Sequence, residues 1–211
     1  MTREQQKQLK ILKQYLPKVV QNNIKSYGFK KKDNMVWYKK NEMYFSLLVG
    51  IRERDGHCYC FSQETIKPLW LDDLFWDIMD MAENKSQPLS LRCIGAFAIR
   101  GMVNFQDEQK LLEWSADELE KYVAAYVEHF SYTVKNSDIE SYYSLFDSTA
   151  YQGHIQEILV LLHKCEYQKA LEKIQTIKDR GQFCNKGIWF KEYAEIYCKK
   201  CIQDGCAVDM K

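Results

Sequence analysis

The sequence predicts an α+β fold in which a four-stranded, mainly antiparallel sheet is covered by helices. The first observation is an alternation of apolar residues along one segment, at Met43, Phe45, Leu47, Val49 and Ile51. Successive side chains of a strand point to opposite faces, so this period of two indicates a half-buried strand. The second observation is that flanking segments repeat apolar residues every three or four positions, which is the period of amphipathic helices. One apolar sheet face and several one-sided helices predict helices packed on a sheet.

The four predicted strands all lie within residues 1–137, whereas residues 138–211 show helical periodicity throughout. We therefore predict an α+β domain at 1–137 and an all-helical subdomain at 138–211 that packs on it. The 211 residues suffice for this arrangement, and only 9 glycines and 3 prolines argue against long linkers.

Residues 3–27 are predicted to form the first helix. Its apolar stripe recurs at three- and four-residue steps, at Leu12, Leu16, Val19, Val20 and Ile24. Pro17 lies within this pattern and predicts a kink or a break, because proline cannot donate the helical hydrogen bond. Gly28 is expected to end the helix, since glycine readily adopts the left-handed conformation of a C-terminal cap.

A three-stranded meander is expected next, with strands at Val36–Lys39, Met43–Arg52 and His57–Ser62. Asp55-Gly56 separates the last two strands and tolerates the positive φ angles of a tight hairpin turn. This meander supplies three of the four strands in the predicted sheet.

The segment after the meander is predicted to hold a helix at Leu71–Glu83 and the fourth strand at roughly Leu89–Val103. The strand prediction rests on apolar or small residues at alternate positions from Leu89 to Ile99. Asn104–Glu113 is then expected to form a turn with one or two helical turns.

The strongest local signal is Ser115-Ala-Asp-Glu118, which matches a helix capping box. The helix that follows is predicted to pack on the sheet, because it keeps one apolar stripe over four turns. That stripe consists of Leu119, Tyr122, Val123, Tyr126, Val127, Phe130 and Val134. After Ser137, four further helices are predicted, at 138–146, 152–163, 166–179 and 187–203.

Charge is distributed unevenly, although the whole chain carries only +1. Residues 1–67 hold 14 Lys/Arg and 6 Asp/Glu, whereas residues 68–147 hold 6 Lys/Arg and 15 Asp/Glu. This asymmetry indicates either a basic binding face or oppositely charged segments that pack beside each other. The second interpretation is favoured, because nucleic-acid-binding proteins usually carry an excess of positive charge.

The N-terminal residues lack the apolar stretch of a secretory signal, and no apolar run approaches the roughly 20 residues that span a bilayer. A cytoplasmic location without membrane contact is therefore predicted. There the 8 cysteines are expected to be reduced thiols that pack as small hydrophobes. The pairs Cys58/Cys60 and Cys198/Cys201 have spacings compatible with zinc, but they lie in different predicted parts of the chain. No metal site is therefore predicted.

Sequence motifs for a catalytic nucleophile, a phosphate-binding loop or a zinc peptidase are absent. Catalysis is therefore unsupported, no cofactor is predicted, and whether the protein is an enzyme is left open. Asp73, Asp77 and Asp80 share one helix face and either bind a cation or form the polar side of an amphipathic helix, which is favoured. His129, on the capped helix, is the candidate catalytic or binding histidine.

Cationic and aromatic residues gather around the meander, and the candidate binding residues there are Lys30, Lys31, Trp37, Tyr44, Arg52 and Arg54. Cations that pair with phosphates and rings that stack on bases are how proteins hold single-stranded nucleic acid. The favoured alternative is that the lysines guard a sheet edge against pairing with another chain.

Two resemblances to known families add to these predictions. Tyr27-Gly28-Phe29-Lys30-Lys31-Lys32 lies between a helix and a hairpin and resembles the start of uncharacterised bacterial domain families, over about residues 10–110. This resemblance implies an α+β fold in a cytoplasmic bacterial protein, with no assigned reaction; some proteins of this type are immunity partners of bacterial toxins. Tyr167-Gln-Lys-Ala170-Leu171 is similar to the packing point of a tetratricopeptide hairpin, although the Trp and Leu-Gly of that repeat are missing.

These observations predict a non-enzymatic module that binds another protein, with an immunity-like role as one form of it. The first alternative is an enzyme with a site in a groove between the sheet and the helical subdomain, using His129. The second alternative is nucleic-acid binding through the basic hairpin. The sequence identifies neither the partner nor the oligomeric state.

Overall fold

The chain forms two compact units, each built from two separate stretches of sequence. The computed structural model describes residues 2–94, 97–147, 154–177 and 183–205. The first unit combines Met1–Pro68 with Arg100–Leu145, and the second combines Leu69–Ile99 with Phe146–Lys211. This division differs from the predicted boundary after Ser137, because apolar side chains between Leu71 and Met81, together with Ile99, are buried with those of the C-terminal helices.

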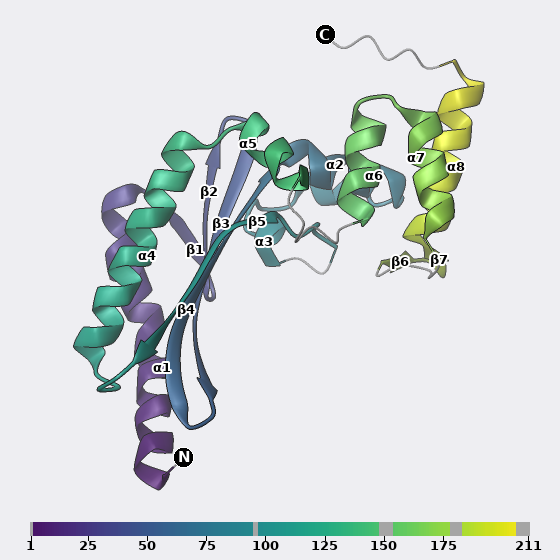
Figure 1. Cartoon of the computed structure of the whole chain (residues 1–211). Helices are drawn as coiled ribbons and strands as arrows, with labels where there is room; N and C mark the ends of the chain where they lie inside the picture. The colour runs from purple at the N-terminus through teal and green to yellow at the C-terminus, as the bar shows by residue number, and fades with distance from the viewer. Residues whose placement is uncertain (1, 95–96, 148–153, 178–182, 206–211) are drawn as a thin grey trace. The chain divides into compact units, whose positions relative to one another are not determined.

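The first unit contains a five-stranded antiparallel sheet whose strands follow one another in chain order (Figure 1). The strands are β1 (Lys30–Lys32), β2 (Met35–Lys40), β3 (Met43–Arg54), β4 (His57–Pro68) and β5 (Met102–Leu111). The predicted α+β class and the meander β2–β4 are confirmed. The sheet has one strand more than the four predicted: β1, whose three lysines pair with β2, was not predicted, and β5 takes the place of the predicted fourth strand.

The β3–β4 hairpin fixes which side chains share a face of the sheet. Asp55 and Gly56 connect the strands with φ angles of 53° and 74°, the positive values that a two-residue hairpin turn requires. The Gly56 N–H donates to Glu53 Oε1 at 2.7 Å and closes the turn. The register then runs without a shift from Arg54 opposite His57 to Met43 opposite Pro68. This long register aligns the side chains of both strands over the whole sheet.

The predicted strand at Leu89–Val103 is wrong, and so is the predicted turn with helical turns at Asn104–Glu113. Residues 91–94 form a short helix, and the strand is β5, Met102–Leu111. Apolar residues of the earlier segment belong to the second unit, where Ile99 is buried and Trp76 Nε1 donates to the Phe97 carbonyl. β5 is polar because it lies at the edge of the sheet, where most of its side chains are at least partly exposed.

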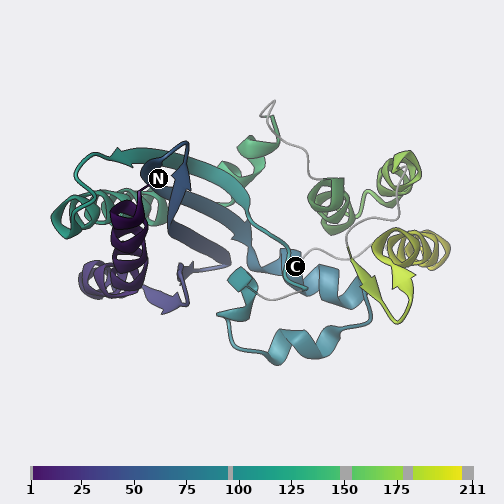
Figure 2. The ribbon, with the colours of Figure 1, turned by 90° about the horizontal axis from the view of Figure 1, so that it is seen from below.

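Two long helices, α1 (Arg3–Ile24) and α4 (Ala116–Asn136), lie beside each other on one face of the sheet, as Figures 1 and 2 show. The predicted cover of the sheet by these helices is therefore confirmed. α1 runs through Pro17 to Ile24 without a break. Most residues of the predicted stripes are buried: Leu12, Leu16, Val19, Val20, Ile24, Leu119, Val123, Tyr126, Val127, Phe130 and Val134. Tyr122 of the predicted stripe is only partly buried, and Thr133, which was not predicted, is buried. On the sheet, the matching buried side chains include Val36, Phe45, Leu47, Val49, Ile51, Cys58, Cys60 and Ile66.

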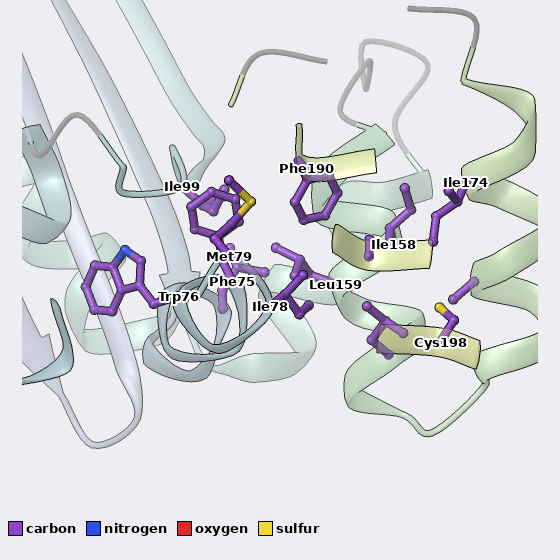
Figure 3. Packing of buried hydrophobic residues seen from close by; sticks show 14 of the residues in the cluster. Phe75, Trp76, Ile78, Met79, Ile99, Ile158, Leu159, Ile174, Phe190 and Cys198 are labelled. Atoms are coloured by element: carbon purple, nitrogen blue, oxygen red, sulfur yellow. The ribbon is translucent and has the colours of Figure 1, made fainter. Parts of the chain in front are cut away.

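The second unit has its own apolar core, seen from close by in Figure 3. Phe75 and Ile78 of one helix, Ile158 and Leu159 of another, and Phe190 of a third are buried together there. The helices are α2 (Leu69–Ile78), α3 (Leu91–Ile94), α6 (His154–His163), α7 (Tyr167–Thr176) and α8 (Phe190–Gln203). The C-terminal part is not all-helical as predicted, because Cys184–Asn185 and Ile188–Trp189 pair as the hairpin β6–β7.

The described part of the chain also contains shorter helical elements. The 3₁₀ turns are η1 (Lys25–Tyr27), η2 (Ala82–Ser86) and η3 (Leu145–Asp147), and α5 spans Ile139–Ser144. As predicted, Gly28 ends the first helical segment in the left-handed conformation, with φ of 70°. Within the described part of the chain, no helix combines the length and the apolar character that crossing a bilayer demands.

Candidate binding site on the five-stranded sheet

The sheet register brings five of the predicted binding residues to one face. Lys30 pairs with Trp37, and Tyr44, Arg52 and Arg54 of β3 follow at positions of the same parity. Because side chains alternate along a strand, these residues point away from α1 and α4. Six exposed cations share that side, which we call the cationic face: Lys30, Lys32, Lys39, Arg52, Arg54 and Lys110.

The two predicted aromatic platforms of this face are buried. Trp37 and Tyr44 are only 7% and 1% exposed, and their rings stack on each other with centroids 5.7 Å apart. Lys30 Nζ lies 5.1 Å from the Trp37 ring centroid, a cation–π contact. Neither ring therefore offers an open surface on which a base or another ligand could stack.

Two other aromatic rings, those of Phe61 and Tyr59, lie on the accessible part of the face. An arginine guanidinium group packs over each ring. The Arg52 guanidinium carbon lies 5.1 Å from the Phe61 centroid, and that of Arg54 lies 4.6 Å from the Tyr59 centroid. Both arginines also form ion pairs with Glu108 of β5, Arg54 at 3.1 Å. The hydrogen bond from Arg52 holds the pKa of the Glu108 carboxyl below its usual range. One carboxylate thus fixes two stacked guanidinium groups.

A hollow of about 400 Å³ opens beside this cluster. Its lining comes from the three adjacent strands β3, β4 and β5: Arg52, Phe61, Ser62, Gln63, Gln106, Asp107 and Glu108. The ring of Phe61 lies over Gly50, where a β-carbon would collide with it. Glycine at position 50 therefore lets the ring lie flat against the sheet. The amides of Gln63 and Gln106 can both donate and accept hydrogen bonds there.

The sequence did not reveal Tyr59, Phe61 or Glu108 as site residues. Tyr59 and Phe61 were detectable in principle, because the Asp55-Gly56 turn places them opposite Arg52 and Gly50. Glu108 lies more than 50 residues away on a strand that the sequence pattern did not predict. Its pairing with Arg52 depends on the order of strands in the sheet.

Lys31 and His129 lie apart from the cationic face. Lys31 has the opposite parity in β1, and its Nζ donates to the Asp33 carbonyl at 3.0 Å. His129 is on α4, where its Nδ1 lies 2.8 Å from Glu64 Oε1 in β4. The ring also stacks on Phe105 of β5, with centroids 3.8 Å apart. The predicted histidine therefore has an acidic partner and an aromatic neighbour.

Glu64 is the buried half of this pair. Its side chain is 1% exposed, whereas that of His129 is 39% exposed. Thr133 Oγ1 donates to the second carboxyl oxygen at 2.6 Å, and burial raises the pKa of Glu64 above its ordinary value. Glu64 thus contacts both His129 and Thr133 and holds the imidazole ring in one orientation beside β4.

The remaining candidate ligands, three aspartates and the cysteines, take part in ion pairs or in packing. Asp73, Asp77 and Asp80 bind three different cations, Arg92, Lys85 and Lys186, at 2.6–2.7 Å. Burial raises the pKa of the Cys58 thiol to about 11 and that of Cys60 to about 12. The seven cysteines of the described segments are thiols that form no disulfide, and Cys206 lies outside those segments. In the same segments, no three His, Cys, Asp or Glu side chains gather into a metal site.

No family model, curated protein or solved structure matches this chain. The features of the sheet that offer chemistry are the cationic face with its hollow and the Glu64–His129 pair.

Proposed function

We propose that the protein is a binding module for another protein and that the hollow beside Arg52 on the cationic face receives the partner. The observation that carries the proposal is the cluster formed by Arg52, Arg54, Phe61, Tyr59 and Glu108. Arginine and aromatic side chains supply a large share of the binding free energy in protein interfaces. Here they surround a hollow that a partner side chain can enter.

The cluster is organised before any partner binds. Each guanidinium has a ring on one side and Glu108 at its end, so its rotamer freedom is already restricted. Immobilising a long side chain on association costs roughly 0.5–1.5 kcal/mol, and a side chain that is already fixed avoids much of that cost. The cluster is therefore suited to specific contact with a defined surface.

The same cluster favours a protein over a nucleic acid. Glu108 neutralises part of the charge of Arg52 and Arg54, and its carboxylate would repel a phosphate placed between them. The Trp37 and Tyr44 rings, which could have stacked on bases, are buried. In the bacterial setting that the Tyr27–Lys32 segment suggests, an immunity partner of a toxin is one form of this proposal.

Affinity capture from lysate of the source cells tests the proposal. We expect the wild-type chain to retain a stoichiometric protein that the double variant Arg52→Ala/Arg54→Ala and the variant Phe61→Ala release. Lys199→Ala/Lys200→Ala removes two exposed cations from α8 and serves as the charge-matched control, which should capture the partner as wild type does.

Two outcomes would refute the proposed function. Equal capture by wild type and by the Arg52/Arg54 variant would place the interface elsewhere on the chain. Loss of the captured material after nuclease treatment, with affinity falling steeply as salt rises, would identify a nucleic-acid-binding protein instead.

A further inference from the structure

The two edges of the five-stranded sheet differ in how open they are to another strand. β1 ends one edge with three residues, all lysines, which is a common protection against strand pairing. β5 ends the other edge with ten residues, and no strand lies beyond it in the described part of the chain. Alternate residues of an edge strand direct their N–H and C=O groups outward, where they can pair with an added strand.

The usable part of the β5 edge is Phe105–Leu111. A bulge near Glu64 and Thr65 interrupts the pairing of β4 with β5, and Asn104 has no opposite residue there. From Phe105 to Leu111 the register against β4 is continuous. Seven residues at about 3.4 Å each give an edge of roughly 24 Å. This is long enough for a specific strand-to-strand contact.

Charge on the cationic face indicates what an added strand must carry on that side. Its side chains there would lie beside Gln106, Glu108 and Lys110 and next to the hollow. Glu108, the acidic residue of β5 on this side, is already paired with two arginines. Lys110 and the two arginines, three cations against the single carboxylate of Glu108, therefore favour acidic side chains on the added strand.

The side of β5 that faces α4 carries aromatic rings instead of cations. Phe105 points to that side with the His129 ring stacked on it, and Tyr132 of α4 lies next to His129 with 66% of its surface exposed. At the Phe105 end, side chains of an added strand that point this way would meet aromatic surface, and farther along they would lie beside Asp107 and Gln109, whose side chains hydrogen-bond each other at 2.9 Å. Apolar residues fit at the Phe105 end, because they would cover rings that now face water.

We propose that the partner adds an extended segment of about seven residues to the β5 edge, with acidic side chains on the cationic face and apolar side chains on the α4 side. Strand addition supplies affinity through main-chain hydrogen bonds and specificity through alternate side chains. This inference rests on the proposed function, because it specifies the conformation and the charge of the protein segment that is bound.

Fluorescein-labelled peptides test the inference. The acidic probe is acetyl-Val-Glu-Val-Glu-Val-Glu-Val-amide, and the basic control has lysine in place of each glutamate. Two further acidic peptides carry N-methyl groups, one on every valine amide and the other on every glutamate amide. Since an added strand pairs through alternate residues on its inner edge, one methylated peptide should lose at least tenfold in affinity and the other should bind nearly as the parent.

Fluorescence anisotropy gives the affinities, and hydrogen exchange should show slower exchange at residues 105–111 when the acidic peptide binds. Lys110→Glu should weaken acidic-peptide binding severalfold, whereas the same charge change at the exposed Lys121 of α4 should not. If both methylated peptides bind like the parent, attraction by charge alone explains the contact and strand addition is wrong. If the acidic peptide fails to bind at millimolar concentration while lysate capture still depends on Arg52 and Arg54, strand addition fails and the proposed function stands.

Discussion

Glu64 is an ionisable side chain at a buried position, where it forms hydrogen bonds with two neighbouring side chains. Strand alternation assigns it to the helix-covered side of β4, at a position of the same parity as the buried Cys60 and Ile66. Its carboxyl gains two hydrogen bonds, from His129 and Thr133, but burial is the larger influence and raises its pKa. A raised pKa means that the folded state favours the protonated acid.

This shift has a direct consequence for stability against pH. Below the ordinary glutamate pKa of about 4.3, Glu64 is protonated in both states and its burial is tolerated. As pH rises through the raised pKa of the folded state, the folded protein must bury a charge that the unfolded chain exposes to water. The free energy of unfolding is therefore expected to fall over that interval.

Urea unfolding of wild type and Glu64→Gln at a series of pH values measures this effect. The glutamine keeps the size of the side chain and cannot ionise, so the variant should lack the part of the fall that is due to residue 64. Glu128→Gln, at an exposed position of the same helix as His129, controls for removing a carboxylate. Parallel pH curves for wild type and Glu64→Gln would contradict the assignment of the shift to this residue.

Single residues were predictable where neighbours in sequence decide their environment. Arg52 and Arg54 were named from the sequence as candidate binding residues, and the alternation and the Asp55-Gly56 turn, both local, bring them to one face of the sheet. Glu64 as the partner of His129, and Glu108 as the partner of both arginines, were not predictable. Each partner arrives through tertiary packing across more than 50 residues of sequence.

The same distinction holds for whole elements. β3 and α4 were predicted because each buries one regular face, and their apolar periods are clear. β5 was missed because an edge strand buries little and its residues 106–110 are polar or charged. Residues 89–99 misled the prediction, since their apolar residues include Phe97 and Ile99 of the second core. An apolar period shows that a segment is buried and does not show which core buries it.

The start of α4 is fixed by Ser115 and Glu118, of which only Ser115 acts as in the predicted reciprocal capping box. Ser115 Oγ accepts from the Glu118 N–H at 3.2 Å, as predicted. The Glu118 carboxylate, however, accepts from the N–H groups of Leu112 and Glu113, at 2.7 and 3.1 Å. It therefore holds the chain that leaves β5 rather than the cap residue itself.

Ser115→Ala is expected to lower the free energy of unfolding by about 1 kcal/mol, because it leaves a backbone N–H at the start of α4 without its acceptor. Ser115→Asp retains an acceptor oxygen and suits the positive end of the helix dipole, so it should be close to wild type. Urea denaturation measures both variants. A loss as large for aspartate as for alanine would show that the hydroxyl of Ser115 does not act as the cap.

At the scale of the whole molecule, the uneven charge of the sequence has a structural explanation within the first unit. Residues 1–68 hold 14 Lys/Arg and 6 Asp/Glu, and residues 100–145 hold 4 Lys/Arg and 9 Asp/Glu. The fold packs these segments together: α1 lies against α4, and Arg52 and Arg54 reach Glu108. Opposite segment charges that attract each other fit the favoured interpretation, while the cationic face keeps a local excess of positive charge.

The division into two units predicts how far the destabilisation caused by a substitution in one core extends along the chain. Leu159 of α6 is fully buried in the second core, and Leu47 of β3 is fully buried in the first. Replacing either leucine by alanine should cost about 2–5 kcal/mol, through lost burial and the cavity that is left. Because the two leucines belong to different compact units, each loss should be confined mainly to its own unit.

Hydrogen exchange followed by mass spectrometry distinguishes the two responses. Leu159→Ala should speed exchange in α2, α6, α7 and α8 while the amides of β3 and β4 keep their protection. Leu47→Ala should produce the reverse pattern, so each variant is the control for the other. Equal loss of protection along the whole chain in both variants would show that the two units unfold as one cooperative body. The inserted segment Leu69–Ile99, which interrupts the first unit in sequence, would then link unfolding of one unit to unfolding of the other.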